Sequence, residues 1–139
     1  MFTHILVPID LGDRNARALR TALELARQRR ARVTLLHVVE SVPNLTPGEL
    51  GDFYARLARA ATRKLEAVAR RFAGAGVRVR TEQCIGEPAR EIVRLAARRH
   101  ADLVVLASHR VRPGRPATGL GTTSHKVAIF CACPVLLVK

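Results

Sequence analysis

The chain alternates between short runs of consecutive apolar residues and longer segments in which apolar residues recur every three or four positions. The short runs are rich in β-branched residues, as in strands whose two faces are both covered. The longer segments have one apolar and one charged face, as in amphipathic helices packed on a core. The pattern predicts an α/β fold in which strands and helices alternate.

Five short segments have the features of strands. Four are dense apolar runs, and one alternates apolar and polar side chains, which predicts a half-exposed strand at a sheet edge. The predicted strands cover residues 4–9, 33–39, 77–82 (the alternating one), 103–107 and 135–138. The predicted helices between them cover residues 16–27, 53–72, 88–99 and 122–131.

The helix boundaries rest on capping and turn residues. Asp13 or Asn15 is expected to cap the first helix, and Pro88 suits the first turn of the third. Residues 41–52 contain two prolines and two glycines, so they predict a long loop with at most a short helical turn. Long ordered loops in compact domains often serve as lids or binding segments.

Strands that are joined by helical crossovers lie parallel, with right-handed connections. The 139 residues therefore predict a single domain, residues 1–139, built as one doubly wound, Rossmann-like parallel sheet with about four helices. In such sheets ligands bind beyond the carboxyl ends of the strands. The candidate positions are Asp10, residues 38–40 and residues 107–110.

The chain is strongly basic, with 24 Lys and Arg residues against 11 Asp and Glu and a formal net charge of +13. This excess indicates either a nucleic-acid footprint or a solvated arginine background. The arginines are scattered over every predicted helix, and four Phe, one Tyr and no Trp leave little aromatic surface for stacking bases. The solvated background is favoured, and nucleic acid is not an expected partner.

The start of the chain lacks the basic segment of a secretory signal. The apolar stretch at residues 127–138 is interrupted by Pro134 and is shorter than the roughly 20 residues that cross a bilayer. Three cysteines without a disulfide framework fit a reducing compartment. The sequence predicts a cytoplasmic protein without a membrane segment.

Two pairs of reactive side chains need an interpretation. Cys131 and Cys133 form either a redox or metal pair or a pair of packed thiols; no second ligand cluster accompanies them, so packed thiols are favoured and no metal site is predicted. His37 lies at a buried strand end, where a bond to the backbone is expected, and His109 has no neighbouring group that completes a triad. No catalytic residue is predicted.

Two positions at the predicted strand ends carry candidate binding chemistry. The carboxylate of Asp10 would either meet a ribose or a cation or cap the turn before the first helix. Segment 108–124 combines Gly119 and Gly121 with three hydroxyl residues at a helix start, where amides and the helix dipole favour anions. This segment is either a phosphate site, with arginines such as Arg110 in support, or a surface loop with ordinary capping residues.

Several blocks of residues, in order along the chain, together resemble the universal stress protein family. The blocks are Ile5-Leu6-Val7-Pro8-Ile9-Asp10, Leu35-Leu36-His37-Val38, Gly86-Glu87-Pro88-Ala89, Ala101-Asp102-Leu103-Val104-Val105 with Ser108-His109, Leu120-Gly121-Thr122, and Cys133-Pro134-Val135-Leu136-Leu137-Val138. The resemblance implies a five-stranded parallel sheet in the order 3-2-1-4-5, a cytoplasmic location and frequent homodimers. It also places the last strand, Val135 to Val138, at a sheet edge, so we expect a homodimer through this strand.

For one branch of the family the resemblance implies a site for ATP or another adenine nucleotide, with Mg²⁺ as a candidate companion. The residues that would border the adenine are Pro8, Ile9 and Val38. Asp10 would meet the ribose or phosphates. The residues corresponding to the first glycine segment are Ala107, Ser108, His109 and Arg110, and those of the phosphate-binding helix start are Gly121, Thr122 and Thr123.

The chain departs from the motif of that branch at two positions, because Ala107 and Arg110 stand where the motif has glycines. Ten residues rather than nine separate Arg110 from Gly121. Two hypotheses follow. The first is a stress-response protein that binds an adenine nucleotide as a regulatory ligand, with at most slow ATP hydrolysis. The second is a nucleotide-free member, closed by Arg110, that acts through contacts with unidentified proteins.

Overall fold

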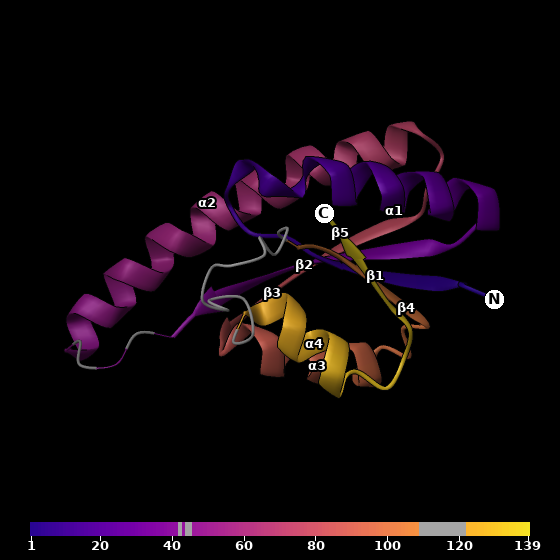
Figure 1. Ribbon diagram of the computed structural model, residues 1–139. Coiled ribbons are helices and arrows are strands. Elements are labelled where there is room, and N and C mark those ends of the chain that lie inside the picture. Colours follow the sequence, from indigo (N-terminus) through magenta and orange to yellow (C-terminus); the bar gives the residue numbers. More distant parts are fainter. Residues whose placement is uncertain (42, 44–45, 109–121) are drawn as a thin grey trace.

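Five parallel strands form one sheet through the middle of the molecule, in the order β3-β2-β1-β4-β5 (Figure 1). The computed structural model describes residues 1–41, 43, 46–108 and 122–139. The strands are β1 (His4–Pro8), β2 (Arg32–Glu40), β3 (Val79–Gly86), β4 (Leu103–Ala107) and β5 (Val135–Val138). The five predicted strands and their order are confirmed, although β3 begins two residues and ends four residues later than predicted. With its alternating side chains, β3 lies at an edge.

Helices cover both faces of the sheet. They are α1 (Ala16–Arg29), α2 (Pro47–Gly74), α3 (Pro88–Arg98) and α4 (Thr123–Phe130), and a 3-10 turn (Asp13–Asn15) precedes α1. Figure 1 shows α1 and α2 on one face and α3 and α4 on the other, which confirms the doubly wound architecture. In the part of the chain that the structure describes, no helix is both long and apolar enough for a membrane span.

The core consists of two apolar clusters, one on each face of the sheet. Ile5 and Val7 of β1 pack with Phe72 of α2 on one face, whereas Leu6 packs with Ile92 of α3 on the other. Successive side chains of a strand point to opposite faces. Because both faces are covered by helices, most positions of β1, β2 and β4 are apolar, and this produces the dense apolar runs in the sequence. The buried polar residues in these strands are His4, Thr34 and His37.

Helix α2 begins at Pro47, six residues before the start predicted from the sequence. The hydroxyl of Thr46 accepts a hydrogen bond from the amide of Glu49 (3.3 Å), and the Glu49 carboxylate accepts one from the amide of Thr46 (3.0 Å). This reciprocal pair is a capping box, and the proline at the first helical position is compatible with it. The expectation of a loop through residues 46–52 is therefore wrong, and α2 extends past the ends of the strands (Figure 1).

The predicted capping of α1 is also wrong. Asp13 lies in the 3-10 turn, and Asn15, at the cap position, makes no side-chain hydrogen bond to the amides of α1. The side-chain amide of Asn15 instead donates to the carbonyl of Asp10 (3.0 Å) and to that of Gly12 (3.1 Å). The residue therefore shapes the turn after β1 instead of starting the helix.

Candidate functional site

A cavity of about 640 Å³ opens at the carboxyl ends of β1, β2 and β4, where ligands bind in doubly wound sheets. Its volume lies in the range of small-molecule sites, which is about 300–1,000 Å³. Eight of the residues that the sequence proposed for a nucleotide line it: Pro8, Ile9, Asp10, Val38, Ala107, Ser108, Thr122 and Thr123. The other three, His109, Arg110 and Gly121, lie outside the described residues.

The turn after β1 fixes the orientation of Asp10 at the cavity. Its Oδ1 accepts hydrogen bonds from the amide of Gly12 (2.8 Å) and from Nδ2 of Asn15 (2.8 Å). Asn15 is only 4% exposed. A Cβ at Gly12 would lie 3.2 Å from Oδ1 of Asp10, so a glycine suits the closeness of this turn. The carboxylate is thus held by its neighbours at the place where a ligand would meet it.

His37 is buried and bonds to the backbone, as the sequence predicted. Its Nδ1 donates to the carbonyl oxygen of Ile9 at 2.9 Å, because a carbonyl can only accept. Ile9 comes directly after β1, so the side chain of His37 occupies the first backbone carbonyl beyond the strand. His37 therefore has a structural role at the point where the pairing of β1 with β2 ends.

The backbone of β2 continues past the end of β1. The pairing of the two strands ends at Pro8 and Leu36, followed by one bond from the Ile9 amide to the Leu36 carbonyl (2.8 Å). In a strand, the N–H and C=O of one residue point to the same side, and residues two apart repeat this direction. Val38 therefore directs its N–H and C=O to the same side as Leu36, into the space beyond β1 where the cavity lies.

Three hydroxyl groups gather at the other end of the cavity. Ser108 follows β4, and its Oγ lies 3.3 Å from Oγ of Ser124; Oγ1 of Thr122 lies 3.3 Å from the same atom. Ser124 is 7% exposed and belongs to the first turn of α4. Thr122, the cap residue, makes no side-chain hydrogen bond to the amides of α4. The start of this helix combines donor hydroxyls with amides that attract an anion.

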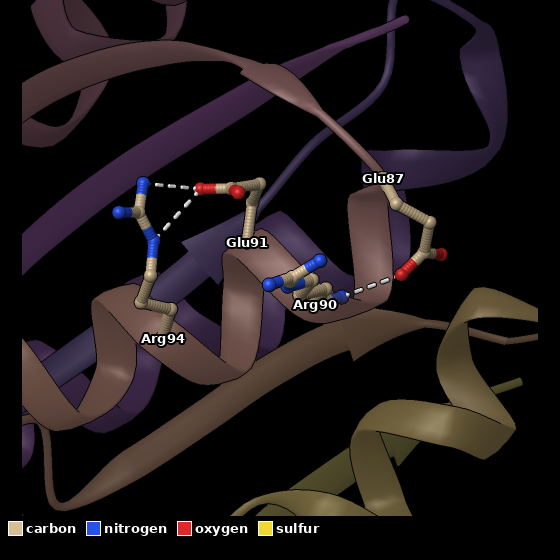
Figure 2. A network of polar contacts seen from close by, with 4 residues as sticks. All are labelled: Glu87, Arg90, Glu91 and Arg94. Carbon is tan, nitrogen blue, oxygen red and sulfur yellow. Dashed lines mark hydrogen bonds and ion pairs between the residues drawn. The ribbon is translucent and has the colours of Figure 1, made fainter.

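The start of α3 lies at the same edge of the sheet but is closed by its own carboxylate. Glu87 accepts hydrogen bonds from the amides of Ala89 (3.2 Å) and Arg90 (2.9 Å). Figure 2 shows Glu87 beside the first turn, and Glu91 paired with Arg94 on the next. An anion would be repelled by Glu87, so the start of α4 is the better anion site of the two.

The family model described as "Universal stress protein family" matches residues 1–139. The chain belongs to the universal stress protein family. It is 32% identical to universal stress protein YxiE of Bacillus subtilis over the full length of both chains, and 34% identical to a universal stress protein of Thermus aquaticus, again over both full lengths.

Solved structures of universal stress proteins share the fold. UspA of Lactobacillus plantarum superimposes with a TM-score of 0.80 at 28% identity, covering 99% of this chain and 98% of that one. More distant members have been solved with nucleotides. They are an Archaeoglobus fulgidus protein with dAMP (TM-score 0.72, 21% identity, 99% and 98% covered) and an Arabidopsis thaliana protein with AMP (TM-score 0.73, 23% identity, 99% and 91% covered). A further member was solved with cAMP (TM-score 0.75, 22% identity, 99% and 97% covered).

In this universal stress protein, several residues of the cavity were not foreseen from the sequence, among them two from α2 and one from the 3-10 turn. Phe53 and Leu57 come from α2, and Arg14 comes from the 3-10 turn before α1. The two α2 residues are four positions apart, so they share one face of the helix. The spacing Thr46-x-x-Glu49 is the signal that would have revealed the early start of α2. Phe53 and Leu57 lay inside the predicted helix, but no motif marked them as cavity residues.

The cysteine pair lies outside the cavity lining, between α4 and β5. The Sγ atoms of Cys131 and Cys133 are 3.5 Å apart. Burial, together with the hydrogen bond to Cys131, raises the pKa of Cys133 to about 12, so this group stays a thiol near neutral pH. Among the described residues no group of three His, Cys, Asp or Glu side chains forms a candidate metal site.

Proposed function

We propose that this universal stress protein binds ATP or a related adenine nucleotide in the cavity, and that the bound state rather than turnover carries its effect. One observation carries the proposal. The same cavity has a backbone donor and acceptor at one end, on Val38, and hydroxyl groups with a helix start at the other, on α4. This polarity corresponds to a base at one end of the ligand and phosphates at the other.

The end at β2 suits an adenine base. The edge of adenine offers a ring-nitrogen acceptor beside an amino donor, so it pairs with a donor and an acceptor that lie next to each other. The N–H and C=O of Val38 form such a pair, since β1 has ended before this point. The side chains of Pro8 and Ile9 supply apolar contact beside it.

The end at α4 suits the phosphates. The amides of the first turn and the hydroxyls of Ser108, Thr122, Thr123 and Ser124 would bind phosphate oxygens, and Asp10 would accept hydrogen bonds from the ribose. His109, Arg110 and Gly121 join this set through their positions in the family motif. Mg²⁺ prefers few protein carboxylates together with phosphate oxygens and water, so it would enter with the nucleotide.

The fold neighbours that hold dAMP, cAMP and AMP support an adenine ligand of this size. The test is calorimetric titration with AMP and with ATP, with and without Mg²⁺. We expect binding of the wild type, weakened severalfold by Ser124→Ala and unchanged by Thr21→Ala, which removes a hydroxyl on α1 outside the cavity. No heat and no thermal stabilisation at millimolar nucleotide would overturn the proposal and favour the nucleotide-free alternative.

We further propose that the protein forms a homodimer through β5. We also propose that it is located in the reducing cytoplasm, where its three free cysteine thiols stay reduced. Leu136 of β5 is 38% exposed, and Ile129 and Phe130 at the end of α4 are 61% and 70% exposed. Exposed apolar residues beside an unpaired strand edge favour pairing with a second copy. Light scattering should show a dimer that Leu136→Asp dissociates and that Ile85→Asp, on the opposite edge strand β3, leaves intact; a monomeric wild type would contradict this.

A further inference from the structure

Helix α2 brings an aromatic ring to the cavity. Phe53 and Leu57 are both half-buried and line it from the same face of the helix. The sequence has four Phe, one Tyr and no Trp, so aromatic side chains are scarce. Among the described residues that line the cavity, Phe53 is the one residue of these three aromatic types. A rare aromatic side chain in a cavity wall calls for an explanation by ligand chemistry.

Local structure holds this ring in place. The capping box of Thr46 and Glu49 fixes the start of α2 less than two turns before Phe53. The ring centroid of Phe53 lies 5.5 Å from that of Tyr54, with 61° between the ring planes, which is a favourable edge contact. Phe53 is thus presented by a capped helix and a neighbouring ring, although α2 here extends past the strands.

The position of α2 relative to the sheet decides which part of a nucleotide Phe53 would meet. Helix α2 packs on β2 and β3, whereas α4 packs on β5 and α3. In the strand order 3-2-1-4-5, these are opposite flanks of the cavity. Phe53 therefore lies on the flank of Val38 and away from the hydroxyls of Ser108 and Ser124.

We propose that Phe53 stacks on the base of the bound nucleotide and so determines specificity for ligands that carry an aromatic base. The proposal rests on the proposed function, because it assigns the base to the β2 end of the cavity. Any purine offers a π-face to an aromatic ring, whereas a sugar phosphate does not. Leu57, one turn further along α2, extends the same apolar wall.

The experiment compares ligands with and without a base. Stacking of a base on an aromatic side chain is worth about 1–3 kcal/mol, so Phe53→Ala should weaken AMP binding by about 5-fold to 150-fold. Binding of ribose 5-phosphate should not change. Ile85→Ala truncates an exposed apolar side chain on β3, outside both the cavity and the proposed dimer surface, and should leave both affinities unchanged. Phe53→Leu keeps the apolar bulk without the π-face, so it serves if the alanine variant does not fold.

A second arm uses fluorescence. Because the chain has no Trp, Phe53→Trp introduces a single indole at the proposed stacking position. This variant should retain AMP affinity, and AMP but not ribose 5-phosphate should quench its emission. This fluorescence measurement tests the stacking role even where ribose 5-phosphate binds too weakly for its affinity to be measured.

The outcomes separate this inference from the proposed function. If the wild type binds AMP but Phe53→Ala binds it equally well, or if AMP leaves the emission of Phe53→Trp unchanged, the stacking role is wrong while nucleotide binding stands. If Phe53→Ala weakens the binding of AMP and of ribose 5-phosphate by the same factor, Phe53 maintains the cavity but does not stack on the base. If the wild type binds no adenine nucleotide, both proposals fail.

Discussion

His4 is a titratable residue inside the sheet, at the end opposite the cavity. It is 4% exposed; its Nδ1 donates to the carbonyl of Arg99 (3.0 Å), and its Nε2 lies 2.8 Å from the hydroxyl of Thr34. Burial lowers the pKa of His4, and the hydrogen bond to Arg99 offsets part of this effect. The ring is therefore neutral in the folded protein under conditions in which the unfolded chain would begin to protonate it.

The pH dependence of stability follows from this shift. Since the pKa of His4 is lowered below 6.5 on folding, the unfolded state binds more protons in the interval below 6.5. We expect the free energy of unfolding to fall as the pH drops through that interval, and His4→Gln to flatten the slope there. Chemical denaturation at a series of pH values measures the free energy of unfolding. An unchanged slope in His4→Gln would contradict the assignment of this pH dependence to His4.

Asp102 provides a second pH window in the same cluster. Hydrogen bonds from the amides of Thr3 (2.8 Å) and His4 (3.0 Å) outweigh burial and lower the pKa of Asp102 below 3.8. Its contribution is present above 3.8 and is lost as the pH falls through the lowered value. Asp102→Asn should therefore reduce the acid-side loss of stability. The fall in stability below pH 6.5 should persist or deepen in this variant, because the Asp102 charge raises the pKa of His4, whereas His4→Gln should remove it.

Gly86 permits a close contact between β3 and α3. A Cβ at this position would lie 2.7 Å from Cγ of Glu91, whose carboxylate pairs with Arg94. Gly86→Ala should destabilise the fold by about 1–3 kcal/mol, as overpacking does, and Glu91→Ala in the same chain should remove most of that cost. Gly48→Ala is the control, because nothing lies within 4 Å of its Cβ position and alanine favours the helix. Thermal unfolding of the three variants and the wild type measures these differences; equal effects of the two glycine substitutions would count against the contact.

At the level of whole elements, the start of α2 links stability to the cavity. Thr46→Ala removes the side-chain acceptor of the capping box and should cost about 1 kcal/mol. Because Phe53 lies shortly after the cap, the same variant should also weaken AMP binding. Thr46→Ser keeps the hydroxyl and should restore both properties. Denaturation and calorimetry test the pair; a Thr46→Ala variant that loses stability but binds AMP normally would show that the cap and the cavity are uncoupled.

β1, β2 and β4 were predictable because they are buried between two layers of helices and carry dense apolar runs. The edge strand β3 was predictable from its alternating side chains and β5 from a short apolar run. The early start of α2 was not, because Pro47, Gly48 and Gly51 are ordinary turn residues and outweighed the spacing of Thr46 and Glu49. Proline at the first helical position loses no hydrogen bond, and a capping box stabilises the exposed first turn, so the local pattern is compatible with a helix after all.

At the level of the whole molecule, the cavity is assembled from segments far apart in the chain. The strand ends supplied Asp10 and Ser108 as candidates, since parallel topology brings carboxyl ends to one edge. Phe53 and Leu57 enter only because α2 extends past that edge, which depends on helix length and packing and not on any motif at these residues. The sequence therefore indicated the polar part of the site better than the apolar part.

The net charge of +13 also acts at this scale, through repulsion within the folded chain. Among the described residues the ion pairs are Arg94 with Glu91 and Arg99 with Glu82, both outside α1 and α2. On α2, Arg56, Arg59 and Arg63 are all exposed. Arg59 lies three residues after Arg56 and four residues before Arg63. These spacings place the three guanidinium groups side by side on one face of the helix.

Arg59→Glu should therefore stabilise the protein. Each repulsive pair at these spacings costs about 0.2–0.5 kcal/mol, and the substitution replaces two such pairs by attractive ones, with Glu placed favourably four residues before Arg63. Arg59→Gln removes the repulsion without adding attraction and should give about half the gain. Raising NaCl from about 10 mM to 1 M shortens the Debye length from about 30 to 3 Å, so the gain should shrink with salt while the wild type itself becomes more stable. Thermal unfolding across this range decides the matter: a gain that persists at high salt would come from helix propensity, and no gain at low salt would show that the arginines on α2 do not repel one another appreciably.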